Sequence, residues 1–319
     1  MQFLQLNEEL QYFKSKYEVT KELETIVTSL GYTLFEPDFF EPYDRFIQMN
    51  QRVKTNSLVK LLDQDGAVLV LRPDITTSVI KRVVPKWVDG TNLRLFYLST
   101  IFSRSSTGMT EEKKQFGIEN LGSEQRTADI ETIQLVVRIL KQFRLSFLVE
   151  LSNNQFLNAL LQELNLSTPL EKELKEILYY KNQAAFDQFL RKNPMKESYL
   201  PLVSQLLQLQ GTMDEIKNKL HPYPLTNAMR RAIDDLDDLI SSLSQEDQTQ
   251  FVRIDLTVLS QYDYYDGLLF KAYVPTIPVP ILSGGRYDPL TKSYGRQIPA
   301  IGFTLHMSDL IKEVIRQNE

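Results

Sequence analysis

The sequence predicts an α+β fold in which an antiparallel sheet is flanked by helices and interrupted by a helical insertion. Segments with strand patterns stand on both sides of a long helical block. Two apolar runs flank Asp65-Gly66, a dipeptide typical of tight hairpins, which indicates antiparallel pairing. Single strands do not alternate regularly with helices, as they would in a doubly wound parallel sheet. We therefore expect a core formed by residues 1–152 and 247–319, and an insertion over residues 153–246.

The first 152 residues contain helix and strand patterns in mixed order. Apolar residues at helical spacing predict a helix over 15–30, and Gly31 is suited to end it. The other elements predicted here are a short strand before Pro37, a hairpin over 58–74, a helix over 75–84, strands over 93–102 and 116–122 joined by a polar loop, a helix at about 125–143 and a strand over 146–152.

The middle of the chain, residues 153–246, is almost wholly helical in pattern and contains few glycines. The pattern Thr168–Glu171 predicts a capping box with proline at the first helical position. Strand patterns return in three segments, over 251–260, 264–274 and 278–288, and a last helix begins near Ser308.

The composition restricts the kinds of function that the chain could have. Cysteine is absent, so disulfides, thiolate metal sites and cysteine nucleophiles are excluded. The only histidines are His221 and His306, and His221 stands before prolines, where a loop or capping role is expected. The net charge of −5 provides no general basic field for nucleic acid.

The N-terminal segment carries charges throughout and has no apolar core of the signal-peptide kind. No apolar run approaches the ~18 residues needed to cross a bilayer. We expect a soluble, cytoplasmic protein with no membrane or nucleic-acid partner.

Two motifs have both a chemical and a plain structural interpretation. The run "DDLDD", Asp234–Asp238, fits a magnesium-diphosphate pattern, yet the apolar residues of the same helix place the aspartates on its solvated flanks. The run "SGGRYD", Ser283–Asp288, is rich in glycine but lacks the spacing and the lysine of a phosphate-binding loop. We favour the structural interpretation for both.

Polar residues in "LRPDITTS" and "QFGIENL" are candidates for ligand binding. Asp74 can cap the following helix, or it can join Thr76 in accepting hydrogen bonds from a ligand ammonium group. Gln115, Gly117 and Glu119 share one side of a predicted strand. A carboxylate on a buried face needs a partner, although an edge strand in water would explain it equally well.

The stretch "LSQYDYYDGLLF", residues 259–270, combines strand-forming residues with two aspartates and a glycine. It is either a strand with an awkward turn or the wall of a pocket.

Taken together and in order, these segments resemble the catalytic core of histidyl-tRNA synthetase. The matching segments are "GYTLFEP", "LRPDITTSVIKR", "RLFYLSTIF", "QFGIENLG", "DYYDGLLF", "SGGRYD" and "PAIGFTLHMSDL", within roughly residues 5–312. The pairing of "DYY" with "GGRYD" is specific to the histidine branch of this class. The resemblance implies a class II aminoacyl-tRNA synthetase-like antiparallel sheet flanked by helices, with a helical insertion and a self-dimer through the first helix and strand.

The resemblance also implies a histidine pocket and no metal or cofactor. Asp74 and Thr76 stand where the family holds the α-amino group, and Gln115 stands beside the amino-acid backbone. Glu119 and Tyr264 stand where the imidazole is recognised, with Tyr265 adjacent. An acid and a phenol can both pair with an imidazole, so we interpret these tyrosines as a pocket wall rather than as core packing.

The chain departs from the synthetase pattern where the family places cations. Ser103 and Ser105 replace an arginine and a glutamate that serve ATP, and Ser260 and Asp309 replace two further arginines. Losing one stabiliser of developing negative charge costs about 3–4 kcal/mol, so we expect no useful catalysis. The chain also ends soon after the last motif, so we expect no anticodon-binding domain.

A synthetase core without these features is similar to a known paralogous family, the regulatory subunits of short-form ATP phosphoribosyltransferase. That similarity implies a non-catalytic protein that assembles with a separate catalytic subunit in histidine biosynthesis and helps histidine to exert feedback inhibition. Two alternatives remain open at this point. One is an ATP-dependent enzyme that activates an amino acid without charging tRNA, using Arg94, Arg104, Arg286 or Arg296. The other is an RNA-binding module.

Overall fold

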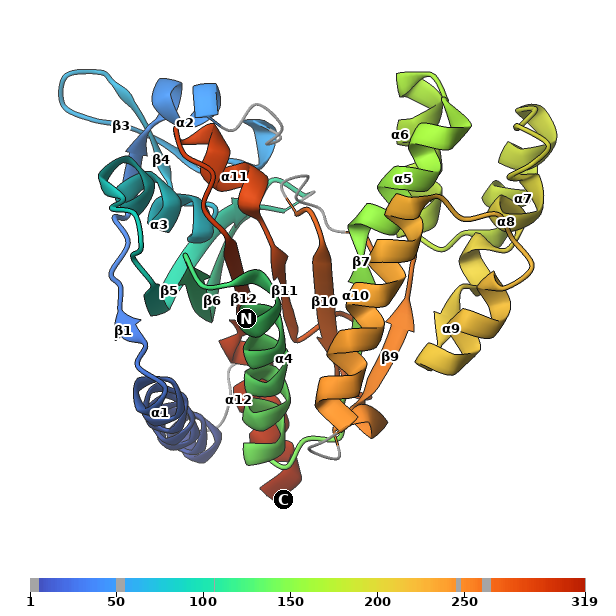
Figure 1. Cartoon of the computed structure of the whole chain (residues 1–319). Helices are drawn as coiled ribbons and strands as arrows, with labels where there is room; N and C mark the ends of the chain where they lie inside the picture. Colours follow the sequence, from blue (N-terminus) through green and yellow to red (C-terminus); the bar gives the residue numbers. More distant parts are fainter. Residues whose placement is uncertain (1–5, 50–54, 106, 245–247, 260–264, 319) are drawn as a thin grey trace.

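A computed structural model of the chain describes residues 6–49, 55–105, 107–244, 248–259 and 265–318. Its centre is a nine-stranded sheet (Figure 1). In spatial order the strands are β1 (Thr33–Leu34), β5 (Leu93–Arg104), β6 (Thr110–Leu121), β12 (Ala300–His306), β11 (Leu282–Arg286), β10 (Leu268–Tyr273), β7 (Leu148–Asn153), β9 (Val252–Asp255) and β8 (Gln210–Gly211). All neighbours pair antiparallel except β1 with β5 and β7 with β9, which confirms the predicted antiparallel sheet.

The hairpin predicted at Asp65-Gly66 forms, but it belongs to a separate small sheet. Strand β4 (Val68–Leu71) pairs antiparallel with both β3 (Lys60–Leu62) and β2 (Phe40–Pro42). Gly66 has a φ of 79°, as the turn requires. The carboxylate of Asp63 accepts hydrogen bonds from the amides of Asp65 and Ala67, at 3.0 and 2.8 Å, and so fixes the turn.

The polar loop predicted between the strands over 93–102 and 116–122 is much shorter than expected. Strands β5 and β6 remain paired out to Arg104 opposite Thr110. The polar residues in this stretch continue the ladder as an exposed two-stranded ribbon. The prediction of a long loop was therefore wrong. Two paired strands that are both solvated need no buried face, so their sequence need not alternate between apolar and polar residues.

Three long helices cover one face of the large sheet. They are α1 (Leu6–Ser29), α4 (Gln125–Gln142) and α12 (Met307–Asn318), seen in the lower half of Figure 1. Buried apolar residues of these helices pack against Phe116, Ile118 and Phe303. Because side chains alternate along a strand, Gly117 and Glu119 lie on the opposite face.

That opposite face is covered by a second, smaller core. It includes Ile75 and residues of α3 (Thr76–Val83), the residues flanking α11 (Asp288–Ser293), and Leu95 and Tyr97 of the sheet. The described part of the chain also contains α2 (Tyr43–Met49) and short 3₁₀ turns at Thr55–Ser57, Val84–Lys86, Leu206–Gln208 and Thr249–Phe251.

Residues 154–244 are helical, as predicted, apart from short connections and β8. The helices are α5 (Asn154–Leu164), α6 (Thr168–Tyr179), α7 (Gln183–Lys192), α8 (Leu200–Ser204), α9 (Met213–Leu220) and α10 (Asn227–Ser244). Helix α10 carries the "DDLDD" run and contacts its neighbours through it. Asp238 pairs with Arg126 of α4 at 3.2 Å, and Asp237 pairs with Lys217 of α9 at 2.6 Å.

The stretch 259–270 becomes a strand only at Leu268. Tyr265 and Asp266 precede it outside any helix or strand, and the Asp266 amide donates to the carbonyl oxygen of Arg286 at 2.9 Å. Gly267 has a φ of 106°. Tyr264, with the rest of 260–264, lies outside the described residues. Among the helices that the structure describes, none has both the length and the apolar character to span a membrane.

Candidate functional site

The predicted ligand-binding residues gather on the sheet face that α3 and α11 cover. Strand register places Glu119 beside Gly302, and Gly302 beside Gly285. A side chain at position 302 would collide with the Glu119 carboxylate, and one at position 285 would press on the Tyr265 ring. The glycines therefore leave room on this face for larger side chains from neighbouring segments.

Glu119 is the centre of the site. It is 1% exposed, and both of its carboxylate oxygens accept hydrogen bonds from hydroxyl groups. Thr76 donates to Oε1 at 2.6 Å, and Tyr287 donates to Oε2. Burial raises the pKa of Glu119 to about 8, although these two hydrogen bonds lower it and nearby Asp74 raises it further.

Asp74 precedes α3 and caps it. Its Oδ2 accepts a hydrogen bond from the amide of Thr77 at 2.7 Å, so the capping interpretation is confirmed. Desolvation of its carboxyl group raises the pKa of Asp74 above its usual range, against the hydrogen bonds from Thr77. Within the described ranges, no basic side chain pairs with either Asp74 or Glu119.

Arg72 fixes the backbone just before this site. Its guanidinium is 1% exposed and donates to the carbonyl oxygens of Thr100, Pro37 and Asp38, at 2.7, 2.6 and 3.1 Å. It also stacks 4.2 Å from the centre of the Phe39 ring. These bonds tie the segment that leads into Asp74 to β5 and to the chain before β2.

Tyrosine side chains pack on the same sheet face as Glu119. The hydroxyl groups of Tyr97 and Thr304 lie 2.8 Å apart and share a hydrogen bond. Tyr265 is half-buried and packs against the cluster that contains Tyr97 and Tyr287. Tyr265 therefore packs against this cluster, and its role as a pocket wall stays a prediction; Tyr264 lies outside the described residues.

Gln115 lies on the same side of β6 as Glu119, opposite His306 of β12. The two positions are four residues apart along the strand, a distance of roughly 13 Å. Gln115 is therefore at the other end of the face from Glu119. A ligand that touched both would have to extend along β6.

Sequence reasoning missed Tyr287 and Tyr97. The run "GGRYD" resembles a family signature, which by itself predicts no role for its tyrosine. A usable signal was present, because Gly285 and Tyr287 are two residues apart and so face the same way at the end of β11. Tyr97 lies opposite Gly117 in the register, where a side chain on Gly117 would collide with its ring.

The four arginines that an ATP-dependent enzyme would use to bind ATP are all bonded to other groups of the protein. Arg286 is 1% exposed and pairs with Asp129 and, at 3.1 Å, with Asp288. Arg94 pairs with Glu131 at 2.6 Å, and Arg296 pairs with Asp89. Arg104 donates to the carbonyl oxygen of Gly108, at 3.2 and 3.3 Å.

Comparison with known proteins agrees with this arrangement. The family model described as histidyl-tRNA synthetase matches residues 9–310. An ATP phosphoribosyltransferase regulatory subunit of Geobacillus sp. (strain WCH70) is 31% identical over 314 residues, which cover 95% of this chain and 79% of that protein.

Solved structures share the fold. The crystal structure described as an ATP phosphoribosyltransferase regulatory subunit/histidyl-tRNA synthetase from Bacillus halodurans C has a TM-score of 0.84 and 28% identity, covering 95% of this chain and 79% of that one. A chain from the ATP phosphoribosyl transferase (HisG:HisZ) complex of Thermotoga maritima has a TM-score of 0.71 at 18% identity, covering 92% and 97%. This chain therefore belongs to the histidyl-tRNA synthetase family and, within it, to the ATP phosphoribosyltransferase regulatory subunits.

Proposed function

We propose that this chain is a non-catalytic subunit that assembles with the catalytic subunit of ATP phosphoribosyltransferase and conveys feedback inhibition by histidine. One observation carries the proposal: the site contains the buried carboxyl group of Glu119, the half-buried Asp74, and no cation that pairs with them among the described residues. A ligand that brings positive charge would supply the missing partner.

Histidine has the chemistry that this site lacks. Its α-ammonium group is cationic, and its imidazole can donate a hydrogen bond or become protonated. Burial disfavours the charged forms of Asp74 and Glu119 in the free protein. A cationic group placed between them would stabilise both carboxylates and would gain charge-assisted hydrogen bonds.

The absence of catalysis is the second part of the proposal. The arginines at 94, 286 and 296 are held by carboxylates, and that at 104 by a backbone carbonyl oxygen. Freeing a buried arginine such as Arg286 to meet a nucleotide would leave Asp129 and Asp288 without their cation.

A self-dimer through the first helix and strand also belongs to this proposal. One side of α1 carries four exposed apolar residues at helical spacing: Leu6, Leu10, Phe13 and Tyr17, which are 71%, 48%, 57% and 68% exposed. Leu34 of the short edge strand β1 is 50% exposed. Such a stripe next to an open sheet edge is suited to meet a second copy of the chain.

Calorimetry with the co-purified complex tests the histidine site. We expect histidine to bind the wild-type complex and to bind at least tenfold more weakly to complexes carrying Asp74→Ala or Glu119→Gln. Glu111→Gln is the matched control, because Glu111 lies on the same strand but on the exposed ribbon, where it pairs with Lys113. Unchanged binding and unchanged inhibition in the two pocket variants would refute the sensor function.

Co-purification tests the assembly itself. A tagged copy of this chain should retain a phosphoribosyltransferase catalytic subunit, and activity should require both. The cytoplasmic location and the division into a core (1–152 and 247–319) and an insertion (153–246) are part of the same proposal.

A further inference from the structure

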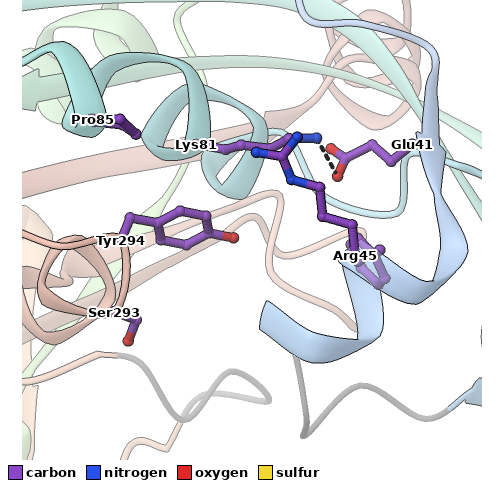
Figure 2. A pocket seen from close by; sticks show the side chains of 7 residues that line it. Glu41, Arg45, Lys81, Pro85, Ser293 and Tyr294 are labelled. Carbon is purple, nitrogen blue, oxygen red and sulfur yellow. Dashed lines mark hydrogen bonds and ion pairs between the residues drawn. The ribbon is translucent and has the colours of Figure 1, made fainter.

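A second pocket, of about 150 Å³, lies between α2, α3 and α11 and is distinct from the site around Glu119 (Figure 2). Its lining residues are Glu41, Arg45, Phe46, Lys81, Pro85, Ser293 and Tyr294. A cavity of roughly 150 Å³ accepts benzene in another protein, so this one has room for a small ligand.

The pocket faces away from Glu119, although the charge of Glu41 in its lining acts on nearby Asp74 and raises its pKa. Thr76 of α3 bonds to Glu119, whereas Ser78 and Lys81 of the same helix bond to Glu41, at 3.2 and 2.9 Å. At 3.6 residues per turn, Ser78 points about 160° away from Thr76 around the helix axis. Glu119 and Glu41 therefore lie on different sides of α3.

The charges in the pocket do not balance. Glu41 is 4% exposed and is neutralised by Lys81. Arg45 adds a second cation, and in the described part of the chain it makes no hydrogen bond or ion pair. Figure 2 shows Arg45 and Lys81 extending toward the same region, with the Tyr294 hydroxyl directed toward them.

We propose that this pocket binds a small oxyanion, either a phosphate group or a carboxylate, through Arg45 and Lys81. Arginine offers a planar fork of donors that matches either group, and lysine adds a compact charge. Ser293 and Tyr294 line the pocket beside these two cations, and the Ser293 hydroxyl donates to the carbonyl oxygen of Pro289 at 3.2 Å. Phe46 and Pro85 provide apolar surface that limits the site to a small ligand.

Titration calorimetry on the full chain tests this site with inorganic phosphate and with acetate, at constant ionic strength set by sodium chloride. We expect one saturable site for at least one of the two anions, and the preferred anion identifies the ligand class. Arg45→Gln should weaken binding at least tenfold. Arg138→Gln, which changes an exposed arginine of α4 that does not line the pocket, should leave binding unchanged.

Protection of Lys81 from an amine-acylating reagent, followed by mass spectrometry, gives a test that needs no variant. The preferred anion should slow modification of Lys81 severalfold and leave the nearby exposed Lys86 unaffected. Equal protection of both lysines, equal binding to Arg45→Gln and wild type, or no saturable binding of either anion would overturn the proposal.

Discussion

The carboxylate of Glu119 meets two hydroxyl groups and, in the residues that the structure describes, no cation. Hydroxyl donors satisfy its oxygens but do not balance its charge, so burial dominates and the pKa rises to about 8. In the unfolded chain the same group would have an ordinary pKa near 4.5. Between these values the folded protein keeps a proton that the unfolded chain releases.

This difference predicts how stability depends on pH. As pH rises from 4.5 to about 8, Glu119 should lower the free energy of unfolding, with a slope of up to roughly 1.4 kcal/mol per pH unit. Glu119→Gln cannot ionise, so its stability relative to wild type should increase over this range. Thermal unfolding from pH 5 to 8 measures the difference, and Glu111→Gln, at a side chain that is 41% exposed beside Lys113, is the control. Parallel curves for wild type and Glu119→Gln would contradict this prediction.

For individual residues, the sequence was sufficient to identify the two carboxyl groups, Asp74 and Glu119, but not all of the side chains that bond to them. The motifs identified Asp74, Thr76 and Glu119, and the structure brings these three together. The role of Thr76 differs from the predicted contact with a ligand ammonium group, because its hydroxyl already donates a hydrogen bond to Glu119. Tyr287 could not be placed without the sheet register, since it reaches Glu119 from 168 residues away in sequence.

At the scale of elements, the site depends on strands that approach one another through glycines. Gly302 lies between Glu119 and Gly285 in the register. A Cβ atom at 302 would collide with both the Glu119 carboxylate and the carbonyl oxygen of Ile118. The side chain could move, but the backbone of β6 could not without breaking its ladder.

Gly302→Ala is therefore expected to destabilise the protein by about 1–3 kcal/mol. Because Ile118 also blocks the new methyl group, shortening the acid in a Glu119→Ala, Gly302→Ala double variant should not restore the loss. Chemical denaturation of the single and double variants measures this. Full recovery in the double variant would show that only the carboxylate constrains position 302.

The exposed apolar residues of helix α1 indicate that the chain forms a dimer. Its buried side was found from the sequence through Val19, Leu23 and Ile26, but the sequence pattern did not reveal that the helix begins at Leu6 with a second apolar side. Phe13→Glu places a charge on that side and should raise the dimer dissociation constant at least tenfold. Sedimentation velocity measures it, and Val88→Glu, at another exposed apolar residue, is the control. An unchanged dimer in Phe13→Glu would place the interface elsewhere.

At the scale of the whole molecule, the antiparallel sheet and the helical content of 154–244 could be predicted, because both leave periodic patterns in the sequence. The ends of β5 and β6 could not be predicted, because the solvated part of this ribbon has no alternation of apolar and polar residues. The pairing between distant strands could not be predicted either. Strand β7 lies between β10 and β9, which begin 115 and 99 residues after β7 ends at Asn153. Only a resemblance to a family could supply that order.

The distribution of cations across the molecule predicts that it does not activate histidine. Adenylation needs positive groups at the reacting phosphate, and removing one such stabiliser typically costs about 10²–10³-fold in rate. Arg94, Arg286 and Arg296 are each held by a carboxylate. We therefore expect no histidine-dependent ATP–pyrophosphate exchange by this chain, alone or with its partner, under conditions in which a histidyl-tRNA synthetase assayed in parallel is active. Exchange that saturates with histidine, and that is lost when Arg286 is replaced by methionine, would instead establish a truncated amino-acid-activating enzyme.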